Sequence, residues 1–377
     1  MDPTLSRRRF TGALGAAVGA AVAGLPRPGA ASLARGEPAD LVQLNSNENP
    51  YGPSPAALAA MTAAQAVACR YPDAAEEEVA LAIARHHGVR PERVVLGCGS
   101  ADVLRMAGVA FLGPGRTVLA AEPTFEAVLA YARVTRAEPV KVPLTADFRH
   151  DLDAMARACD ARTGLVYVCN PNNPTGTIVR GEDLDAFLAQ VPVTAVVLVD
   201  EAYHHFVEDP AYRSVVSTIA SRPNVVVTRT FSKIYGMAGL RLGYAIASEA
   251  NAKALSARAA WSNANAAVLA AALASLAQDG LVAAQRERMN ATRRALCREL
   301  ERDGRRYIRS EANFVMIETG ADVKPLVAAF KARKILVGRR FAAMPTWLRV
   351  SIGRPEETSA FLAVLRELVP ARAGQAG

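Results

Sequence analysis

The polar residues of this sequence that could take part in catalysis follow short apolar runs. "VVLGCGSAD" contains a glycine turn followed by Ser100, "LVYVCNPNNPTG" ends in residues 170–176, and "AVVLVDEAY" contains Asp200. A fourth run, "VVVTRTFSK", ends in Lys233. A lone lysine is usually a solvated surface charge. Here it is accompanied by backbone amides, carboxamides, a carboxylate and hydroxyls that all follow apolar runs.

This combination suits pyridoxal phosphate (PLP) chemistry. A lysine such as Lys233 forms a Schiff base with the cofactor aldehyde, is displaced by the substrate amine, and can then move a proton. A carboxylate such as Asp200, placed against the pyridine nitrogen, keeps that nitrogen protonated, so that the ring accepts the electrons of a carbanion. The phosphate needs amides at a helix start, which residues 97–101 offer. It also needs hydroxyls and a cation, and the candidates are Thr230, Ser232 and Arg241.

Each of these features also has a purely structural explanation. Asp200 could cap a helix, "NPNNPTG" could be a turn, and "GCGSAD" is a weak glycine-rich pattern. Their shared position after apolar runs favours one site, because ligands of open α/β sheets bind outside the carboxyl ends of the strands.

The apolar runs predict an α/β fold. From about residue 90, "RVVLG", "TVLAAEP", "GLVYVCN", "AVVLVDE", "NVVVTRT" and "GYAIAS" recur with helical stretches between them. Runs of this kind, without polar alternation, are typical of strands buried on both faces, as in a mostly parallel central sheet flanked by helices. "SADVLRMAGVAFLG" and "EDLDAFLAQ" have the apolar spacing of helices.

The N-terminus has the pattern of an export signal. The twin arginines Arg7 and Arg8 precede an uncharged Ala/Gly/Val run at 11–25, which is too short and too weakly apolar for the roughly 20 residues of a bilayer span. Ser32 and Ala34 offer small residues for cleavage, and twin-arginine signals are a known bacterial class. We therefore expect a periplasmic or exported protein without a stable membrane anchor, or a cytoplasmic one if the signal is not used.

The character of the chain changes after about Ser248. An Ala-rich helical segment is followed by a long charged helix from Leu281 to about Asp303 and then by the short strands "NFVMIE" and "WLRVSIG". We interpret this part as a connecting helix and a smaller α+β domain. The predicted organisation is a signal peptide at 1–34, an N-terminal arm at 35–60, a large PLP-binding domain at 61–270 and a small C-terminal domain at 271–377.

Composition argues against several other classes. With 377 residues and 51% hydrophobic content, the chain can bury a large core. Its net charge of +8 falls to +5 without the four arginines and one aspartate that precede residue 35, and no basic run suggests nucleic acid. The five cysteines lack CxxC spacing and the histidine pairs are adjacent, so we expect no disulfide framework and no metal site. We interpret the cysteines as small core residues.

The ordered motifs resemble the class I/II aminotransferases, most closely the histidinol-phosphate aminotransferase-like group. The resemblance covers about residues 40–355 and rests on "NENPYG", "YPD", "CNPNNPTG", "VDEAY", "FSKIYGMAGLRLGY" and "LRVSIG". It implies a PLP-dependent transaminase that moves an amino group between an amino acid or amino alcohol phosphate and a 2-oxo acid such as 2-oxoglutarate.

The resemblance also implies roles for the cofactor-binding residues. Lys233 would be the covalent lysine and proton shuttle, and Asp200 would pair with the pyridine nitrogen. Asn173 and the catalytic Tyr203 would hydrogen-bond the phenolic oxygen of the cofactor. The implied phosphate ligands are the amides of Ser100 and Ala101 and the side chains of Thr230, Ser232 and Arg241.

Further roles concern the substrate and a second subunit. Arg349 would bind the substrate carboxylate or an equivalent anion, Asn173 would also lie near the substrate, and Arg339 is a candidate for a second anionic group. Phe125 stands where the family usually has a tyrosine, and it would stack on the cofactor without a hydroxyl. Tyr51 would reach the cofactor phosphate of the other subunit, which implies a homodimer with shared active sites.

Two alternatives to transamination stay open. The same lysine and aspartate motifs serve decarboxylases, lyases and amino acid oxidases, because the bond broken depends on which Cα bond lies perpendicular to the ring, and the sequence does not fix that angle. The second alternative is a non-enzymatic exported binding protein that kept the fold. The presence of all four expected site residues argues against it: Lys233, Asp200, Tyr203 and Arg349.

Overall fold

The structure, a computed structural model, describes residues 41–370 of the chain. The predicted signal peptide at 1–34 lies outside the described residues. Within the described residues, the chain from Val42 to Pro370 forms one compact unit. The predicted boundary between two domains near residue 270 stays a prediction.

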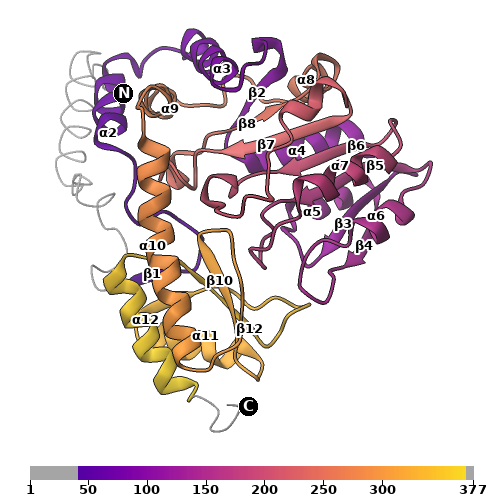
Figure 1. The fold of residues 1–377 in the computed structure, drawn as a ribbon. Helices are drawn as coiled ribbons and strands as arrows, with labels where there is room; N and C mark the ends of the chain where they lie inside the picture. Colours follow the sequence, from indigo (N-terminus) through magenta and orange to yellow (C-terminus); the bar gives the residue numbers. More distant parts are fainter. Residues whose placement is uncertain (1–40, 371–377) are drawn as a thin grey trace, which may run out of the picture. The chain divides into compact units, whose positions relative to one another are not determined.

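A seven-stranded sheet with the order β2-β8-β7-β6-β5-β3-β4 dominates the first two thirds of this unit (Figure 1). Its strands are β2 (Val94–Gly97), β3 (Thr117–Glu122), β4 (Glu138–Pro143), β5 (Thr163–Cys169), β6 (Val196–Asp200), β7 (Val225–Thr230) and β8 (Gly243–Ile246). The neighbours from β4 to β7 are parallel, whereas β8 is antiparallel to both β7 and β2. The predicted, mostly parallel α/β fold is confirmed, and β4 is an additional strand that the sequence pattern did not indicate.

Both faces of this sheet are buried, as the uninterrupted apolar runs predict. Leu165 and Tyr167 of β5 face one hydrophobic cluster, while Val166 and Val168 face the other. Successive side chains of a strand point to opposite faces, so a strand covered on both sides must be apolar throughout. The first cluster includes α4 (Ser100–Phe111), α5 (Ala127–Thr135) and α8 (Glu249–Ser256), and the second α3 (Asp73–His87), α6 (Leu152–Ala158), α7 (Gly181–Gln190) and α9 (Ala266–Leu276).

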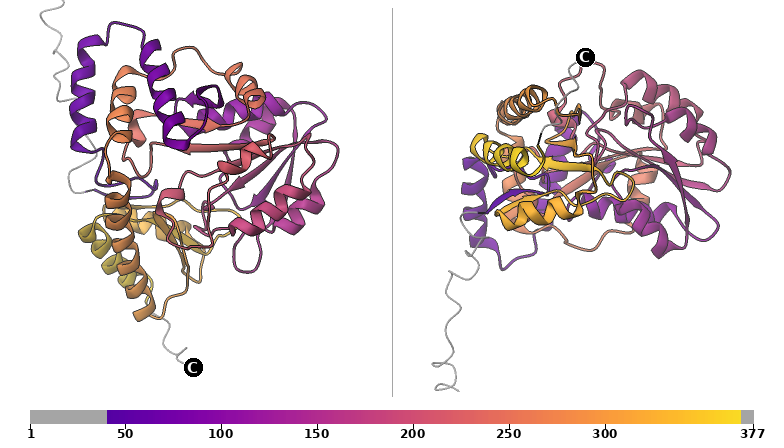
Figure 2. Two further views of the ribbon diagram at one scale, coloured as in Figure 1. Left: turned by 45° about the horizontal axis from the view of Figure 1, so that its top comes forward. Right: turned by 90° about the horizontal axis from the view of Figure 1, so that it is seen from below.

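A second group of elements surrounds a three-stranded antiparallel sheet. Its strands, in the order β12-β10-β9, are β9 (Tyr307–Ile308), β10 (Phe314–Glu318) and β12 (Trp347–Ser351). The helices α11 (Val323–Ala332) and α12 (Pro355–Leu368) lie side by side in this group (Figure 2). They pack through the stacked rings of Phe330 and Phe361. The long helix α10 (Leu281–Arg302) leads from the end of α9 into this group and contacts α12.

The first described elements join both groups. Strand β1 (Val42–Leu44) pairs in parallel with β11 (Ile335–Val337), and α2 (Pro55–Ala64) packs on α9. Helix α2 begins at Pro55, because Ser54 Oγ accepts a hydrogen bond from the Ala57 amide and proline is favoured at the first helical position. Between β1 and α2 lies the "NENPYG" segment.

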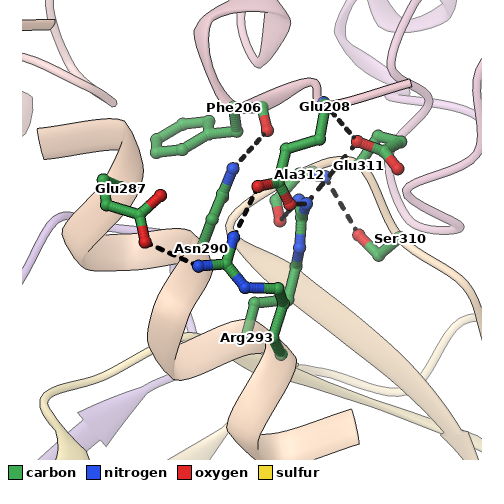
Figure 3. Close-up of polar contacts among 9 residues, drawn as sticks. Phe206, Glu208, Glu287, Asn290, Arg293, Ser310, Glu311 and Ala312 are labelled. Carbon is green, nitrogen blue, oxygen red and sulfur yellow. Dashed lines mark hydrogen bonds and ion pairs between the residues drawn. The ribbon is translucent and has the colours of Figure 1, made fainter. Parts of the chain in front are cut away.

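A buried arginine links the two groups of elements (Figure 3). Arg293 of α10 donates hydrogen bonds to the carbonyl of Ala312, at 3.0 Å, and to the carboxylate of Glu208, at 2.9 Å. The Glu208 amide in turn donates to Glu311 at 2.7 Å, and Asn290 donates to the carbonyl of Phe206 at 2.8 Å. These contacts fix the segment after β6 against the segment before β10.

The expectation that the cysteines are small core residues is wrong for two of them. Cys169 is buried at the end of β5, but Cys98 lies exposed in the turn between β2 and α4, and Cys69 is exposed before α3. Both cysteines lie in turns or loops, which run over the surface of a protein. A prediction of burial from residue type alone was therefore wrong for them. Among residues 41–370 no single helix is long and apolar enough to cross a bilayer, although α9 and α10, bent by 90°, pass that test as a pair.

Candidate active site

The strand ends gather the predicted polar residues at one edge of the large sheet. Asp200 at the end of β6 is paired in register with Cys169 of β5 on one side and with Thr228 of β7 on the other. Together with the turn after β2, these ends border a cavity of about 700 Å³, called the site cavity below. Its lining includes Ser100, Ala101, Phe125, Asn173, Asp200, Tyr203, Thr230, Ser232, Lys233, Arg241, Arg339 and Arg349.

The Lys233 amine lies inside this cavity. Its Nζ donates hydrogen bonds to the carbonyl of Asn47, at 2.9 Å, and to the carbonyl of Ser46, at 3.2 Å. Burial, assisted by the positive charge of Arg349, lowers the pKa of Lys233 to about 8. A lysine with such a pKa is neutral, and therefore nucleophilic, in a useful fraction of molecules near neutral pH.

Asp200 is buried at the floor of the cavity and is held by two donors. The Tyr167 hydroxyl donates to Asp200 Oδ2 at 2.8 Å, and the Ala202 amide donates to Oδ1 at 3.2 Å. Burial raises the pKa of Asp200 to about 6. Burial destabilises the charged form of this carboxylate, and a protonated ring nitrogen beside it would stabilise that form by supplying a positive charge.

Tyr203 and Asn173 share one hydrogen-bonded chain with Arg349. Asn173 Nδ2 donates to the Tyr203 hydroxyl oxygen at 3.2 Å, and Arg349 Nη1 donates to Asn173 Oδ1 at 2.7 Å. Asn47 Nδ2 donates to the same tyrosine oxygen at 3.1 Å. The Nε of Arg349 is buried without a hydrogen-bond partner, and the residue lines the site cavity.

The start of α4 is shaped to hold a phosphate. Gly99 adopts φ +80°, and a Cβ at this position would lie 2.1 Å from Nη2 of Arg241. A Cβ at Gly243 would lie 2.2 Å from the amide nitrogen of Ser100. Because both glycines lack a side chain, the Arg241 guanidinium and the helix amides converge on one point, where Arg241 Nη1 also donates to Ser232 Oγ at 3.2 Å.

The outer wall of the cavity carries the aromatic and second cationic candidates. Phe125 is 38% exposed and Arg339 lies over the Phe341 ring, 4.5 Å from its centroid. Arg339 also donates to Glu126 at 2.7 Å. Both predicted residues therefore lie at the mouth of the same cavity.

Tyr51 is the one predicted site residue that does not line the site cavity of its own chain. Its ring packs under the guanidinium of Arg288, 3.3 Å from the ring centroid, with Arg354 at 5.6 Å. Its predicted role toward a second subunit stays a prediction.

Sequence reasoning missed several polar residues of the site, among them Asn47, Tyr167 and Glu48. Asn47 donates to Tyr203 and also binds Ser351 through its backbone amide, Tyr167 supports Asp200, and Glu48 lines the cavity. The "NENPYG" motif contained the signal for Asn47 and Glu48, but only its tyrosine was given a role. The signal for Tyr167 is a phenol inside the otherwise apolar run "GLVYVC".

A buried ion pair supports the ends of β6 and β7 from the opposite face. Glu201 accepts hydrogen bonds from Nε and Nη2 of Arg229, at 3.0 and 2.8 Å, and from the Ser214 hydroxyl at 2.8 Å. Because strand side chains alternate, Glu201 and Arg229 point away from the cavity that Asp200 and Thr230 face. The pair thus fixes two of the strand ends that deliver site residues.

Comparison with known proteins agrees with this arrangement. Residues 39–365 match the aminotransferase class I and II family, and the chain belongs to that family. A histidinol-phosphate aminotransferase of Moorella thermoacetica is 38% identical over 333 residues, which cover 88% of this chain and 86% of that protein. An aromatic amino acid aminotransferase of Rhodococcus jostii is 41% identical over 322 residues, 85% of this chain and 88% of that protein.

A solved structure adds the cofactor. The histidinol-phosphate aminotransferase of Sinorhizobium meliloti in complex with pyridoxal-5'-phosphate matches with a TM-score of 0.83 and 26% identity, covering 93% of this chain and 97% of that one. The chain is a PLP-dependent aminotransferase, and its residues fit that cofactor. The converging phosphate donors, the buried Asp200 and the low-pKa Lys233 surround one cavity.

Proposed function

We propose that this enzyme moves an amino group from a donor with a distal phosphate or aromatic group, such as histidinol phosphate, to a 2-oxo acid such as 2-oxoglutarate. The observation that carries the proposal is that two arginines, Arg349 and Arg339, line the same cavity as Lys233. Two guanidinium groups can bind an anion at the reacting end and another at the distal end of a substrate.

The relatives support both kinds of donor. Those named above are a histidinol-phosphate aminotransferase and an aromatic amino acid aminotransferase. The mouth of the cavity here is lined by Phe125 and Phe341 as well as Arg339, so aromatic and anionic groups would each find a complementary surface.

Each site residue has a defined task in this proposal. When bound, PLP supplies an aldehyde that reacts with amines and a ring that stabilises negative charge on the substrate Cα. Lys233 Nζ would carry the proton to and from that carbon. Asp200 would keep the ring nitrogen protonated, and Arg349 would orient the substrate through its carboxylate or phosphate.

A panel of single amino compounds tests the proposal. Purified holoenzyme is mixed with histidinol phosphate, phenylalanine, tyrosine or glutamate, and the cofactor absorbance is followed. We expect conversion to the pyridoxamine phosphate form, which 2-oxoglutarate then reverses. Release of carbon dioxide, ammonia or peroxide without this reversal would instead identify a decarboxylase, lyase or oxidase.

We also propose a homodimer with shared active sites, in which Tyr51 reaches the cofactor phosphate of the partner. Tyr51 lies outside the site cavity of its own chain, and Tyr71 and Trp261 are 87% and 97% exposed. Large exposed aromatic residues are typical of surfaces that a partner covers. A sedimentation measurement that gives the mass of one chain, with full activity at the same concentration, would refute the dimer.

Export by the twin-arginine route remains part of the proposal and rests on Arg7 and Arg8. Residues 1–40 are fused to a folded fluorescent reporter, and the wild-type fusion is compared with Arg7→Lys/Arg8→Lys. We expect periplasmic fluorescence only for the wild type. Cytoplasmic fluorescence in both fusions would contradict export.

A further inference from the structure

Arg339 forms an ion pair with Glu126. Of these two residues, only Arg339 lines the site cavity. Glu126, at the start of α5, accepts a 2.7 Å hydrogen bond from Nη2 of Arg339, which follows β11. Arg339 lines the site cavity, whereas Glu126 lines an adjoining cavity of about 300 Å³. Thr124 and Phe341 line both cavities and form their common wall. Glu126 therefore reaches the substrate space through Arg339.

The ion pair between Arg339 and Glu126 is exposed, so either side chain can exchange the other for a different partner. The side chains of Arg339 and Glu126 are 56% and 64% exposed. Exposed ion pairs contribute little net free energy, because water and ions compete for both groups. Although Glu126 occupies the position that precedes α5, its side chain does not cap that helix. Its carboxylate is thus available to hold the arginine and to release it.

The charges that line the site cavity favour the release of Arg339 from Glu126 when an anion binds. Four cationic residues and two acidic ones line it: Lys233, Arg241, Arg339, Arg349, Glu48 and Asp200. Arg339 and Arg349 are close enough to interact, since the charge of Arg339 adds to the effect of burial in lowering the pKa of Arg349. A distal phosphate or carboxylate between them would relieve this repulsion, and Glu126 could then be solvated.

An uncharged substrate group requires the opposite arrangement. With Glu126 bound, the guanidinium of Arg339 lies against the face of Phe341, 4.5 Å from the ring centroid, and its charge is compensated. An apolar side chain can then pack at the mouth without facing an unpaired cation. We propose that Glu126 is a specificity-determining residue that retains Arg339 for uncharged substrates and yields it to anionic ones. This inference rests on the proposed function, because it assigns both donor classes to one site.

The test replaces the carboxylate by an amide. In Glu126→Gln, we expect the ratio of kcat/KM for histidinol phosphate to kcat/KM for phenylalanine to rise about twofold to fivefold, the size expected of an exposed pair. The matched control is Glu122→Gln, which removes the same charge from a nearby exposed pair, Glu122 with Lys141 at 2.6 Å, outside the site cavity. This control is expected to keep the wild-type ratio.

A double-mutant cycle asks whether Glu126 acts through Arg339. In an Arg339→Gln background, the further change Glu126→Gln should leave the ratio unaltered. If Glu126→Gln raises the ratio equally with and without Arg339, or if Glu122→Gln has the same effect, the inference is overturned.

A binding measurement separates this inference from the proposed function. Inorganic phosphate is titrated into PLP-loaded enzyme by calorimetry, since the cofactor then occupies the cradle at Gly99. We expect Glu126→Gln to lower the dissociation constant of phosphate about twofold to fivefold relative to wild type and to Glu122→Gln. An unchanged constant overturns the inference even if the enzyme transaminates, and a lowered one supports the release of Arg339 even if neither donor is a substrate.

Discussion

Arg349 of β12 donates a 2.7 Å hydrogen bond to Asn173 in the turn after β5, across 176 positions of sequence. The same guanidinium donates to the carbonyl of Asn45 at 2.8 Å, so it links three segments that contribute to the site. Arg349, the proposed anion site, and Asn173, a proposed cofactor ligand, therefore position each other. We expect an anion that binds Arg349 to alter the hydrogen bond between Asn173 and the Tyr203 hydroxyl.

Lys233→Ala should abolish both turnover and covalent retention of PLP. The amine in the cavity is the group that the cofactor aldehyde requires, and removal of that amine leaves only non-covalent binding. After borohydride reduction, intact-mass spectrometry should show a cofactor adduct in the wild type and in the exposed-lysine control Lys253→Ala, but not in Lys233→Ala. An adduct of equal yield in all three proteins would disprove the assignment.

The rate of covalent PLP attachment to the cofactor-free protein should rise with pH up to about 8 and then level off. Burial lowers the pKa of Lys233 to about 8 from its ordinary value of 10.5, so the neutral amine becomes the main form above about pH 8. Stopped-flow absorbance between pH 6 and 10 measures this profile. A rate that keeps climbing to pH 10 would mean that the amine is solvated like an ordinary lysine.

Arg349→Lys should raise KM for 2-oxoglutarate by about tenfold to a hundredfold. An ammonium group cannot reproduce the planar pair of donors, and the loss of one hydrogen bond to a charged group costs about 1.5 to 3 kcal/mol. Arg340→Lys is the control, since Arg340 binds Asp322 outside the cavity. If both variants change KM by less than twofold, Arg349 is not the anion site.

Gly99→Ala should weaken phosphate binding by displacing Arg241. The added Cβ would lie 2.1 Å from Arg241 Nη2, so one charged hydrogen bond is lost and the dissociation constant of PLP should rise about tenfold or more. The measurement is made in a Lys233→Ala background, where binding is non-covalent. Gly115→Ala is the control, because Gly115 has a similar φ of +77° but open space around it. Equal weakening by both changes would show that backbone strain, and not Arg241, is responsible.

Glu201→Gln should destabilise the protein without removing a group from the cavity. It leaves the buried Arg229 without its counter-charge, which typically costs about 3 to 5 kcal/mol in the free energy of unfolding. Urea unfolding of the cofactor-free protein measures the change against Glu122→Gln, whose exposed pair should contribute at most about 1 kcal/mol. Equal shifts in the two variants would contradict a structural role for the Glu201–Arg229 pair.

The sequence predicted that Lys233, Asp200 and Thr230 share one site, and the structure places all three around one cavity, for a physical reason. Asp200, Thr230 and Lys233 lie at or just beyond the ends of uninterrupted apolar runs, and parallel strands bring such ends to one edge. Strand β4 was missed because its sequence, "EPVKVP", is interrupted by proline and lysine, which an edge strand tolerates.

The sequence by itself thus indicated the kind of chemistry: six of the seven strands of the central sheet, the residues that follow them, and an amine, a carboxylate and a glycine turn at one edge. Only the tertiary structure decided that Asn47 binds Tyr203, that Tyr167 supports Asp200 and that Glu126 holds Arg339. These contacts join residues 33 to 213 positions apart in the chain. Side-chain hydrogen bonds at such separations depend on how whole elements pack, and no local periodicity encodes that packing.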